Sequence, residues 1–308
     1  DKTALVYRMA KDYRYVFLSR PRRFGKSLLC STLKEYFEGN KEMFAGLQMA
    51  ELEKDWVKYP VIHFSFAIAK NVSEESLNAI INNILCEAEK KFGLINTEND
   101  CGVRFSNLIK NIYEKTGQKV VVIIDEYDAP MLDSIDNDIL QNKIRSIQNQ
   151  FFSPLKQLDP YLRFVFITGI TKFSQMSIFS ALNNLQDISL LPDYEAICGI
   201  SKDELFTQLK GGLQNFADEN DMTLEQAMER FTKKYDGYHF STKKQDIFNP
   251  FSVIRALNDK MLNDYWFSSA TPTALIKLIC KFDVEISDYE MVECDSFRFN
   301  QPVEKVTD

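Results

Sequence analysis

The sequence predicts an α/β fold in which a parallel sheet forms the middle of three layers. Over the first 199 residues, strand-like segments alternate with helix-like segments, and such alternation requires crossover connections between parallel strands. Residues 120–124 are five consecutive β-branched residues, as expected for a strand that is buried on both faces. From residue 201 onward the pattern changes to helices, which predicts a second and smaller unit.

Each predicted element has a local signal. The strands are rich in aromatic and β-branched residues, and the helices carry apolar residues three or four positions apart, with glycine stops and a Ser73 cap. The predicted strands are residues 13–19, 59–67, 120–124, 163–170 and 187–191. The predicted helices are residues 2–12, 28–37, 73–93, 104–117, 135–158, 201–220, 223–237 and 251–262. We therefore expect two units, residues 1–199 and residues 200–308, with the aromatic residues around Gly237 packed between them.

The composition excludes several classes of protein. The 308 residues have a net charge of −7, so nucleic-acid binding would require a local basic patch. No apolar run approaches the ~20 residues that span a membrane, and there is no signal peptide. The six cysteines are scattered without a C-x-x-C pair, which indicates reduced thiols in a cytoplasmic protein. The sequence has only two histidines, and we expect His63 to lie in the core, so it offers few ligands for a zinc site.

Since the sequence begins at Asp1 with helix-like residues, we also expect that it is a fragment of a longer chain.

A phosphate-binding signal follows the first predicted strand. Residues 20–27 read R-P-R-R-F-G-K-S and lead into a predicted helix. In a phosphate-binding loop (P-loop), backbone N–H groups at a helix N-terminus surround the phosphates, a lysine neutralises their charge, and a serine or threonine hydroxyl binds Mg²⁺. Lys26 and Ser27 suit those two functions. Arg20 occupies the place of the first consensus glycine, and the following Pro21 favours an extended backbone there.

The predicted nucleotide-binding segment comprises Arg22, Arg23, Phe24, Gly25, Lys26, Ser27 and Leu28. An acidic pair, Asp125 and Glu126, ends the apolar strand of residues 120–124. In P-loop ATPases an aspartate in this position belongs to the Mg²⁺ shell, and a glutamate after it polarises the attacking water. The two motifs together predict Mg²⁺-dependent binding and hydrolysis of ATP, with Ser27 and Asp125 at the metal and Glu126 and Lys26 as catalytic residues.

Other polar residues have two interpretations each. Thr168, or as a second choice Thr171, is a candidate sensor of the γ-phosphate, and the alternative is that these threonines finish a strand or cap a helix. Asp128 is either a partner of the magnesium-bound water or a turn cap before Pro130.

The basic candidates are also ambiguous. Arg22 and Arg23 suit contact with the phosphates of the nucleotide, which we favour, contact with a neighbouring subunit, or a nucleic-acid surface. The alternative is a solvated loop beside the acidic residues 125, 126 and 128. Arg145 and Arg163 are candidate arginine fingers, and we interpret both as surface charges.

These segments together resemble the bacterial predicted AAA-ATPase family over nearly the whole chain. The resemblance rests on YVFLSRPRRFGKSLLCSTLKEYFEG, VVVIIDEYDAP, RFVFITGITKFS and YDGYHFS…IFNPFSVIRAL, which occur in this order. R-P-R-R-F-G-K-S is the usual loop of that family, so Arg20 fits the family pattern. The resemblance implies Walker A functions for Lys26 and Ser27 and Walker B functions for Asp125 and Glu126.

The resemblance also implies an architecture. It suggests an AAA/STAND-like P-loop NTPase core in residues 1–199, followed in residues 200–308 by a helical lid and a winged-helix-like segment. Members typically continue into a restriction-endonuclease-like nuclease domain, which this sequence lacks.

Three functions remain open. The first is an ATPase that drives or gates an attached effector. The second is a nucleotide-binding switch with little turnover, and the third is a DNA-associated ATPase. Glu126 favours the ATPase because a pure sensor does not need it, and the acidic composition weighs against DNA binding by this chain alone. Self-association into a homo-oligomer is also open.

Overall fold

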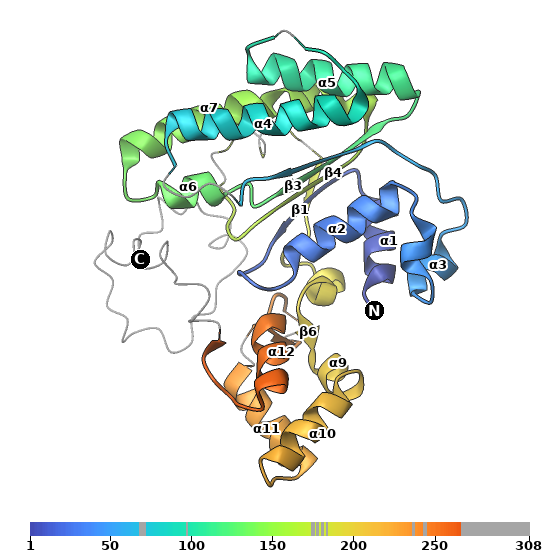
Figure 1. Ribbon diagram of the computed structural model, residues 1–308, viewed down its shortest axis with the longest axis vertical. Helices are drawn as coiled ribbons and strands as arrows, with labels where there is room; N and C mark the ends of the chain where they lie inside the picture. Colours follow the sequence, from blue (N-terminus) through green and yellow to red (C-terminus); the bar gives the residue numbers. More distant parts are fainter. Residues whose placement is uncertain are drawn as a thin grey trace.

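A five-stranded parallel sheet forms the centre of the protein (Figure 1). The computed structural model describes residues 1–265 except 68–71, 97, 174–175, 177–178, 180–181, 183, 236–237 and 243–244. The strand order is β2-β3-β4-β1-β5, which places β4 between β1 and β3. The strands are β1 (Tyr15–Ser19), β2 (Val61–Ser65), β3 (Val120–Asp125), β4 (Leu162–Gly169) and β5 (Leu185–Asp187).

Helices cover both faces of the sheet, as predicted from the alternating sequence (Figure 1). One face packs against α4 (Glu74–Phe92), α5 (Cys101–Thr116) and α7 (Asp138–Phe152). The other face packs against α1 (Thr3–Asp12), α2 (Lys26–Phe37) and α3 (Gln48–Leu52). Alternate residues of β3 belong to the two cores, with Val122 on the first face and Val121 on the second. This explains why residues 120–124 of the strand are all apolar.

Three predicted elements differ from the structure. One is the helix expected over residues 201–220, which is divided into α9 (Lys202–Thr207) and α10 (Lys210–Glu219). The helix expected over residues 135–158 is wrong as a single element, because the region forms α7 and then the 3-10 helix η2 (Ser153–Tyr161). The short helix α6 (Ala129–Asp133) precedes α7. Pro154 lies at the start of η2, and proline removes the N–H donor that a continuous α-helix requires. The strand expected over residues 187–191 lies earlier, at β5. Another 3-10 helix, η1 (Lys41–Phe44), precedes α3.

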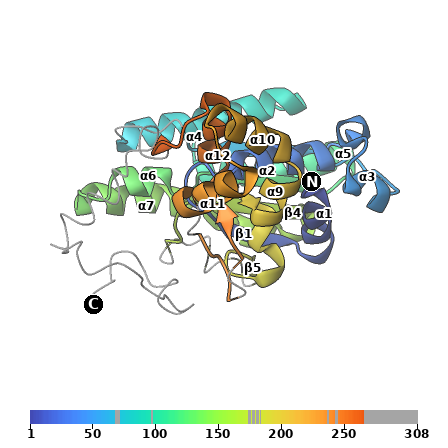
Figure 2. The same cartoon turned by 90° about the horizontal axis from the view of Figure 1, so that it is seen from below.

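A helical unit with its own core follows the sheet. Figure 1 places it below the sheet, on the side that carries α1 and α2, and Figure 2 shows the molecule from that side. The third apolar cluster contains buried residues from Leu205 to Leu257. The elements after β5 are η3 (Pro192–Ile197), β6 (Ile200–Ser201), α9 (Lys202–Thr207), α10 (Lys210–Glu219), α11 (Leu224–Tyr235), β7 (Ile247–Phe248) and α12 (Pro250–Asp259). Residues 266–308 of the expected helical lid and winged-helix-like segment lie outside the described residues.

Two expectations from the composition can be compared with the described residues. Cys30, Cys86, Cys101 and Cys198 all have free thiols, in agreement with the prediction of reduced cysteines. None of the helices in the described ranges is both long enough and apolar enough to cross a membrane.

Candidate functional site

The loop between β1 and α2 has the backbone of an anion-binding turn. Gly25 is the N-cap residue of α2 and has φ = 94°, a left-handed conformation that favours glycine. A Cβ atom at Gly25 would meet no atom within 4 Å, so the glycine is required by conformation and not by space. No described side chain caps α2, which leaves its first N–H groups available to an anion.

Lys26 is folded back into this loop. Its side chain is 5% exposed, and Nζ donates to the carbonyl oxygens of Arg20 at 2.9 Å and Pro21 at 3.0 Å. Burial lowers the pKa of Lys26, and the carboxylates of Asp128 and Glu126 oppose that shift. The amine therefore closes the loop through these two contacts and feels the charge of the acidic residues at the end of β3.

Arg20 has a structural function that its sequence position did not reveal. Its side chain is 1% exposed and turns away from the loop. The two Nη atoms donate to four carbonyl oxygens at 2.7–3.3 Å, those of Ser19, Ser189, Tyr194 and Glu195. The guanidinium also lies 4.0 Å above the Phe240 ring. Burial lowers the pKa of Arg20 to about 10, so the group keeps its charge at neutral pH. The backbone N–H of Arg20 meanwhile continues the β1–β4 pairing by donating to Gly169.

Phe24 connects the loop to the later part of the chain. Its side chain is 1% exposed and packs edge-on against Tyr238 and Phe240, with ring centroids 4.8 and 5.4 Å away. Its carbonyl oxygen accepts from the Gly199 N–H at 3.0 Å. The predicted packing of aromatic residues around Gly237 thus occurs at Tyr238 and Phe240, while Gly237 itself lies outside the described residues. Phe24 can offer a nucleotide its backbone and not its ring.

The other residues of the predicted nucleotide-binding segment are at the surface. Arg22, Arg23, Ser27 and Leu28 are exposed, and Leu28 is 72% exposed. Arg23 has φ = 70°, and its guanidinium lies 4.8 Å from the centre of the Phe251 ring. The hydroxyl of Ser27 is therefore accessible one residue after the buried Lys26.

The acidic pair lies at the carboxyl edge of the sheet. Asp125 is the last residue of β3 and is 3% exposed. Its Oδ1 atom is buried and has no hydrogen-bond partner among the described residues. Glu126 adopts φ = 49°, an uncommon conformation for a residue with a side chain. Burial, and next the charge of Asp125, raise the pKa of Glu126.

Asp128 is the N-cap residue of α6, but its side chain makes no cap hydrogen bond there, so the turn cap considered from the sequence is wrong. Its Oδ2 accepts from the N–H of Ile170 at 2.8 Å, and from the N–H and hydroxyl of Thr171 at 2.8 and 3.1 Å. A Cβ atom on Gly169 would lie 2.4 Å from Asp128 Oδ1, so this close approach requires glycine. Burial raises the pKa of Asp128. Asp128 therefore links the acidic turn after β3 to the loop after β4. In the sequence, the only signal for this contact is that Asp128 and Gly169 both lie close to the ends of their strands.

The candidate sensor threonines already have partners. Thr168 is fully buried, and its hydroxyl donates to the Leu18 carbonyl at 2.7 Å, which links β4 to β1. A contact between Thr168 and a phosphate would require that bond to break. The Thr171 carbonyl accepts from the Tyr127 hydroxyl at 2.8 Å, so this loop is held from two positions of the acidic turn.

The comparison with known proteins agrees with this geometry. The family model described as "Predicted AAA-ATPase" matches residues 1–179, more than half of the chain. The chain belongs to the predicted AAA-ATPase family. It is also 34% identical over 283 residues to a protein of Azotobacter chroococcum mcd 1 described as "Uncharacterized protein in vnfD 5'region". The match covers 91% of this chain and 52% of that relative, so the chain spans about half the length of the curated relative it matches.

The two candidate arginine fingers of this AAA-ATPase-family chain lie on other elements. Arg163 is near the amino end of β4 and donates to the Ala10 carbonyl at 3.2 Å. This is the opposite end of the strand from Gly169, away from the P-loop. Arg145 is on α7, where Nη1 donates to Asn142 Oδ1 at 3.0 Å. The structure brings neither arginine to the loop of its own chain.

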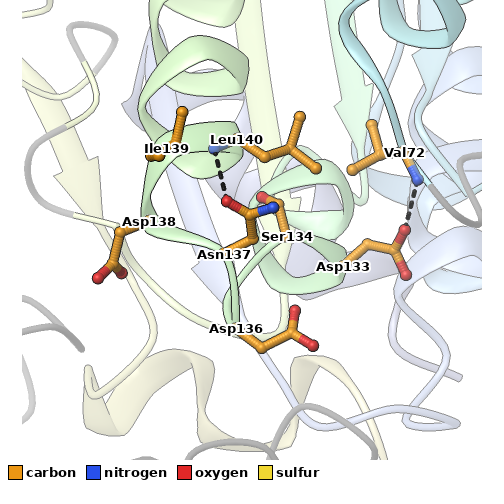
Figure 3. Close-up of a pocket in the computed structure, with 8 residues that line it drawn as sticks. All are labelled: Val72, Asp133, Ser134, Asp136, Asn137, Asp138, Ile139 and Leu140. Carbon is orange, nitrogen blue, oxygen red and sulfur yellow. Dashed lines mark hydrogen bonds between the residues drawn. The ribbon is translucent and has the colours of Figure 1, made fainter.

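One cavity lies away from the P-loop, around α6 and the start of α7 (Figure 3). Asp133 accepts from the Val72 N–H at 2.7 Å on one side, and Asn137 accepts from the Leu140 N–H at 3.0 Å on the other. The lining contains three aspartates and no basic residue. The negative charge of these aspartates repels a polyphosphate, so this cavity does not suit a nucleotide.

Proposed function

We propose that the chain binds ATP with Mg²⁺ and hydrolyses it, as a module that drives or gates an attached effector. One observation carries the proposal. The Lys26 amine at the start of α2 and the carboxylates of Asp125 and Glu126 after β3 lie at the same edge of the sheet, close enough to influence the charge of Lys26. Ligands of open α/β sheets bind at this edge. Membership in the predicted AAA-ATPase family supports nucleotide binding.

The phosphates are placed against the free N–H groups at the start of α2. On binding, Lys26 exchanges the carbonyls of Arg20 and Pro21 for oxygens of the β- and γ-phosphates. That exchange keeps the buried ammonium hydrogen-bonded in both states, which favours binding because an unpartnered buried charge is costly. The exposed Arg22 and Arg23 add positive charge beside the same phosphates.

Two groups fit a magnesium ion. The Ser27 hydroxyl is accessible, and Asp125 Oδ1 is a buried oxygen without a partner. Oxygen ligands of this kind suit Mg²⁺, which also retains several waters. The ion would neutralise charge on the phosphates when bound. Glu126 then orients a water molecule and accepts its proton.

The division of the chain belongs to the same proposal. Residues 1–199 act as the ATPase core, and residues 200–308 act as a helical lid with a winged-helix-like segment. The hydrogen bond from Gly199 to Phe24 and the aromatic packing of Tyr238 and Phe240 on that ring support a mechanical link between the two. A change in the loop on hydrolysis would reach the lid through these contacts.

Two variants and a control test the proposal. Lys26→Ala should weaken ATP binding at least tenfold, since a charge-assisted hydrogen bond contributes about 1.5–3 kcal/mol. Glu126→Gln should keep the affinity and lower turnover about 100-fold or more. Lys156→Ala removes an exposed lysine of η2 and should change neither. Binding of a fluorescent ATP analogue and release of inorganic phosphate are the measurements. Equal phosphate release by the wild type and Glu126→Gln would refute the function of Glu126.

A switch with little turnover is the second candidate, and one observation favours it. The Thr168 hydroxyl is committed to Leu18, so the γ-phosphate lacks that contact in this conformation. The same phosphate-release assay decides between the two candidates. Adding duplex DNA at low salt tests the DNA-associated alternative, because binding through Arg22 and Arg23 would be salt-dependent.

A further inference from the structure

Three side chains of different chemistry meet at the carboxyl end of β3. The thiol of Cys30, the imidazole of His63 and the carboxylate of Asp125 bring one ligand atom each to within 4.8 Å of the others. They come from α2, β2 and β3, three separate elements. The register of β2 and β3 aligns His63 with Ile123 and Ser65 with Asp125, so His63 and Asp125 share the face of the sheet that α2 covers.

We propose that Cys30, His63 and Asp125 bind one Zn²⁺ ion. A thiolate, an imidazole and a carboxylate are the three ligand types of protein zinc sites, and three protein ligands leave a fourth position open. The thiol discourages Mg²⁺ and Ca²⁺, which prefer oxygen ligands. On binding, the Cys30 thiol releases its proton to water and the sulfur donates an electron pair to the metal.

Independent observations point to a ligand in this place. Asp125 Oδ1 is buried and has no hydrogen-bond partner among the described residues, which is costly unless something compensates it. His63 is exposed, contrary to the core position expected from the sequence, and so it provides an entry from solvent. Tetrahedral zinc would space its ligand atoms roughly 3.5 Å apart. The ligand atoms here lie within 4.8 Å of one another, and the exposed imidazole can shorten these distances by rotating about its side-chain bonds.

The neighbouring lysines do not prevent a cation from binding. Lys34 and Lys91 lie near His63, and both contact Glu38, at 3.8 and 2.7 Å. Their positive charge is therefore partly compensated by that carboxylate.

Occupation of the site has a functional consequence, which rests on the proposed ATPase function. Asp125 cannot serve the zinc site and the magnesium shell of a nucleotide in the same geometry. Zinc should therefore inhibit ATP hydrolysis even in an excess of Mg²⁺.

The first test measures the metal directly and does not depend on hydrolysis. Chelator-treated protein is titrated with Co²⁺, whose bond to a thiolate gives a charge-transfer absorption band, and the cobalt is then displaced with Zn²⁺. We expect one ion at this site, loss of the band in Cys30→Ser, and an affinity at least about tenfold lower in His63→Gln. Cys101→Ser, which removes a half-buried thiol of α5, is the matched control and should behave as the wild type. A wild type without the band, or a band that persists in Cys30→Ser, would overturn the site.

The second test measures phosphate release with and without Zn²⁺ at constant Mg²⁺. Zinc should lower the wild-type rate at least about tenfold when the site is filled, and Cys30→Ser and His63→Gln should resist it. His63→Gln changes an exposed residue, so a folding defect is not expected to obscure this result. Zinc binding without inhibition would overturn the competition for Asp125. A cobalt band in a protein that never hydrolyses ATP would refute the proposed function and leave the zinc site intact.

Discussion

Replacing Arg20 with alanine should destabilise the protein more than any other change in the P-loop. The substitution removes a guanidinium that donates to four carbonyl oxygens, two of them at 2.9 and 2.7 Å and two at 3.2 and 3.3 Å. Hydrogen bonds that involve a charged group contribute about 1.5–3 kcal/mol each, and the two long contacts contribute less. The stacking on Phe240 adds about 1 kcal/mol. Because burial of the charge offsets part of this sum, we expect a net loss of about 4 kcal/mol.

Urea denaturation followed by circular dichroism measures this loss as a change in the free energy of unfolding. Arg20→Lys keeps the charge but has no planar fork, and should lose about half as much. Arg22→Ala is the matched control, because Arg22 is exposed in the same loop, and it should change the free energy of unfolding by less than about 0.5 kcal/mol. An Arg20→Ala protein within about 1 kcal/mol of the wild type would refute the reasoning. That result would mean that the four carbonyls find water or other donors.

Three further predictions concern acidic residues. Asp128→Ala should cost about 3 kcal/mol and speed hydrogen exchange of the Thr171 amide, because two backbone donors lose a buried acceptor; unchanged exchange would contradict this function of Asp128. Since the pKa of Glu126 is raised by burial and the residue must be ionised to accept a proton, hydrolysis should decline with falling pH at a higher pH than an ordinary glutamate would cause. A pH–rate profile with its acid limb at or below the ordinary value would refute that expectation. Burial alone would raise the pKa of Glu53, but the Tyr36 hydroxyl and other donors lower it to about 2. The stability that Glu53 provides, about 2 kcal/mol, is therefore present above the ordinary glutamate pKa and is lost as the pH falls towards 2. Glu53→Gln should remove it, and a gap from the wild type that stays constant from pH 5 to pH 2 would contradict the assignment.

The sequence predicts the sheet well because a strand that is buried on both faces needs apolar residues at consecutive positions, and such a run is visible in the sequence. Residues 120–124 are apolar at every position, and both faces of β3 contact helices. The ends of elements were less predictable. The 3-10 helix after α7 and the short β5 depend on proline and on tertiary contacts, and the spacing of apolar residues in the sequence does not predict either of these.

The positions of the candidate site residues at the ends of their strands were predictable, but the directions of buried side chains, which packing decides, were not. Gly25, Lys26, Asp125 and Glu126 lie at the expected edge of the sheet. Arg20, however, occupies a position of the phosphate-binding motif, while its side chain stabilises the fold. The sequence could not show this, because most of the carbonyls that bind the guanidinium belong to residues far along the chain. His63 was expected in the core, but β2 is an edge strand of the sheet, and this position leaves the imidazole exposed.

The Arg20 contacts also bear on the order in which this protein can mature. Ser189 is 169 residues away from Arg20 in the sequence, and Tyr194 and Glu195 are farther still. During synthesis, the strand and helix that flank the loop emerge from the ribosome long before those carbonyls exist. A nascent chain that ends at residue 179 contains every residue matched by the family model and still lacks three of the four acceptors of Arg20. The loop between β1 and α2 therefore reaches its final form late, only after the chain as far as Glu195 has been synthesised.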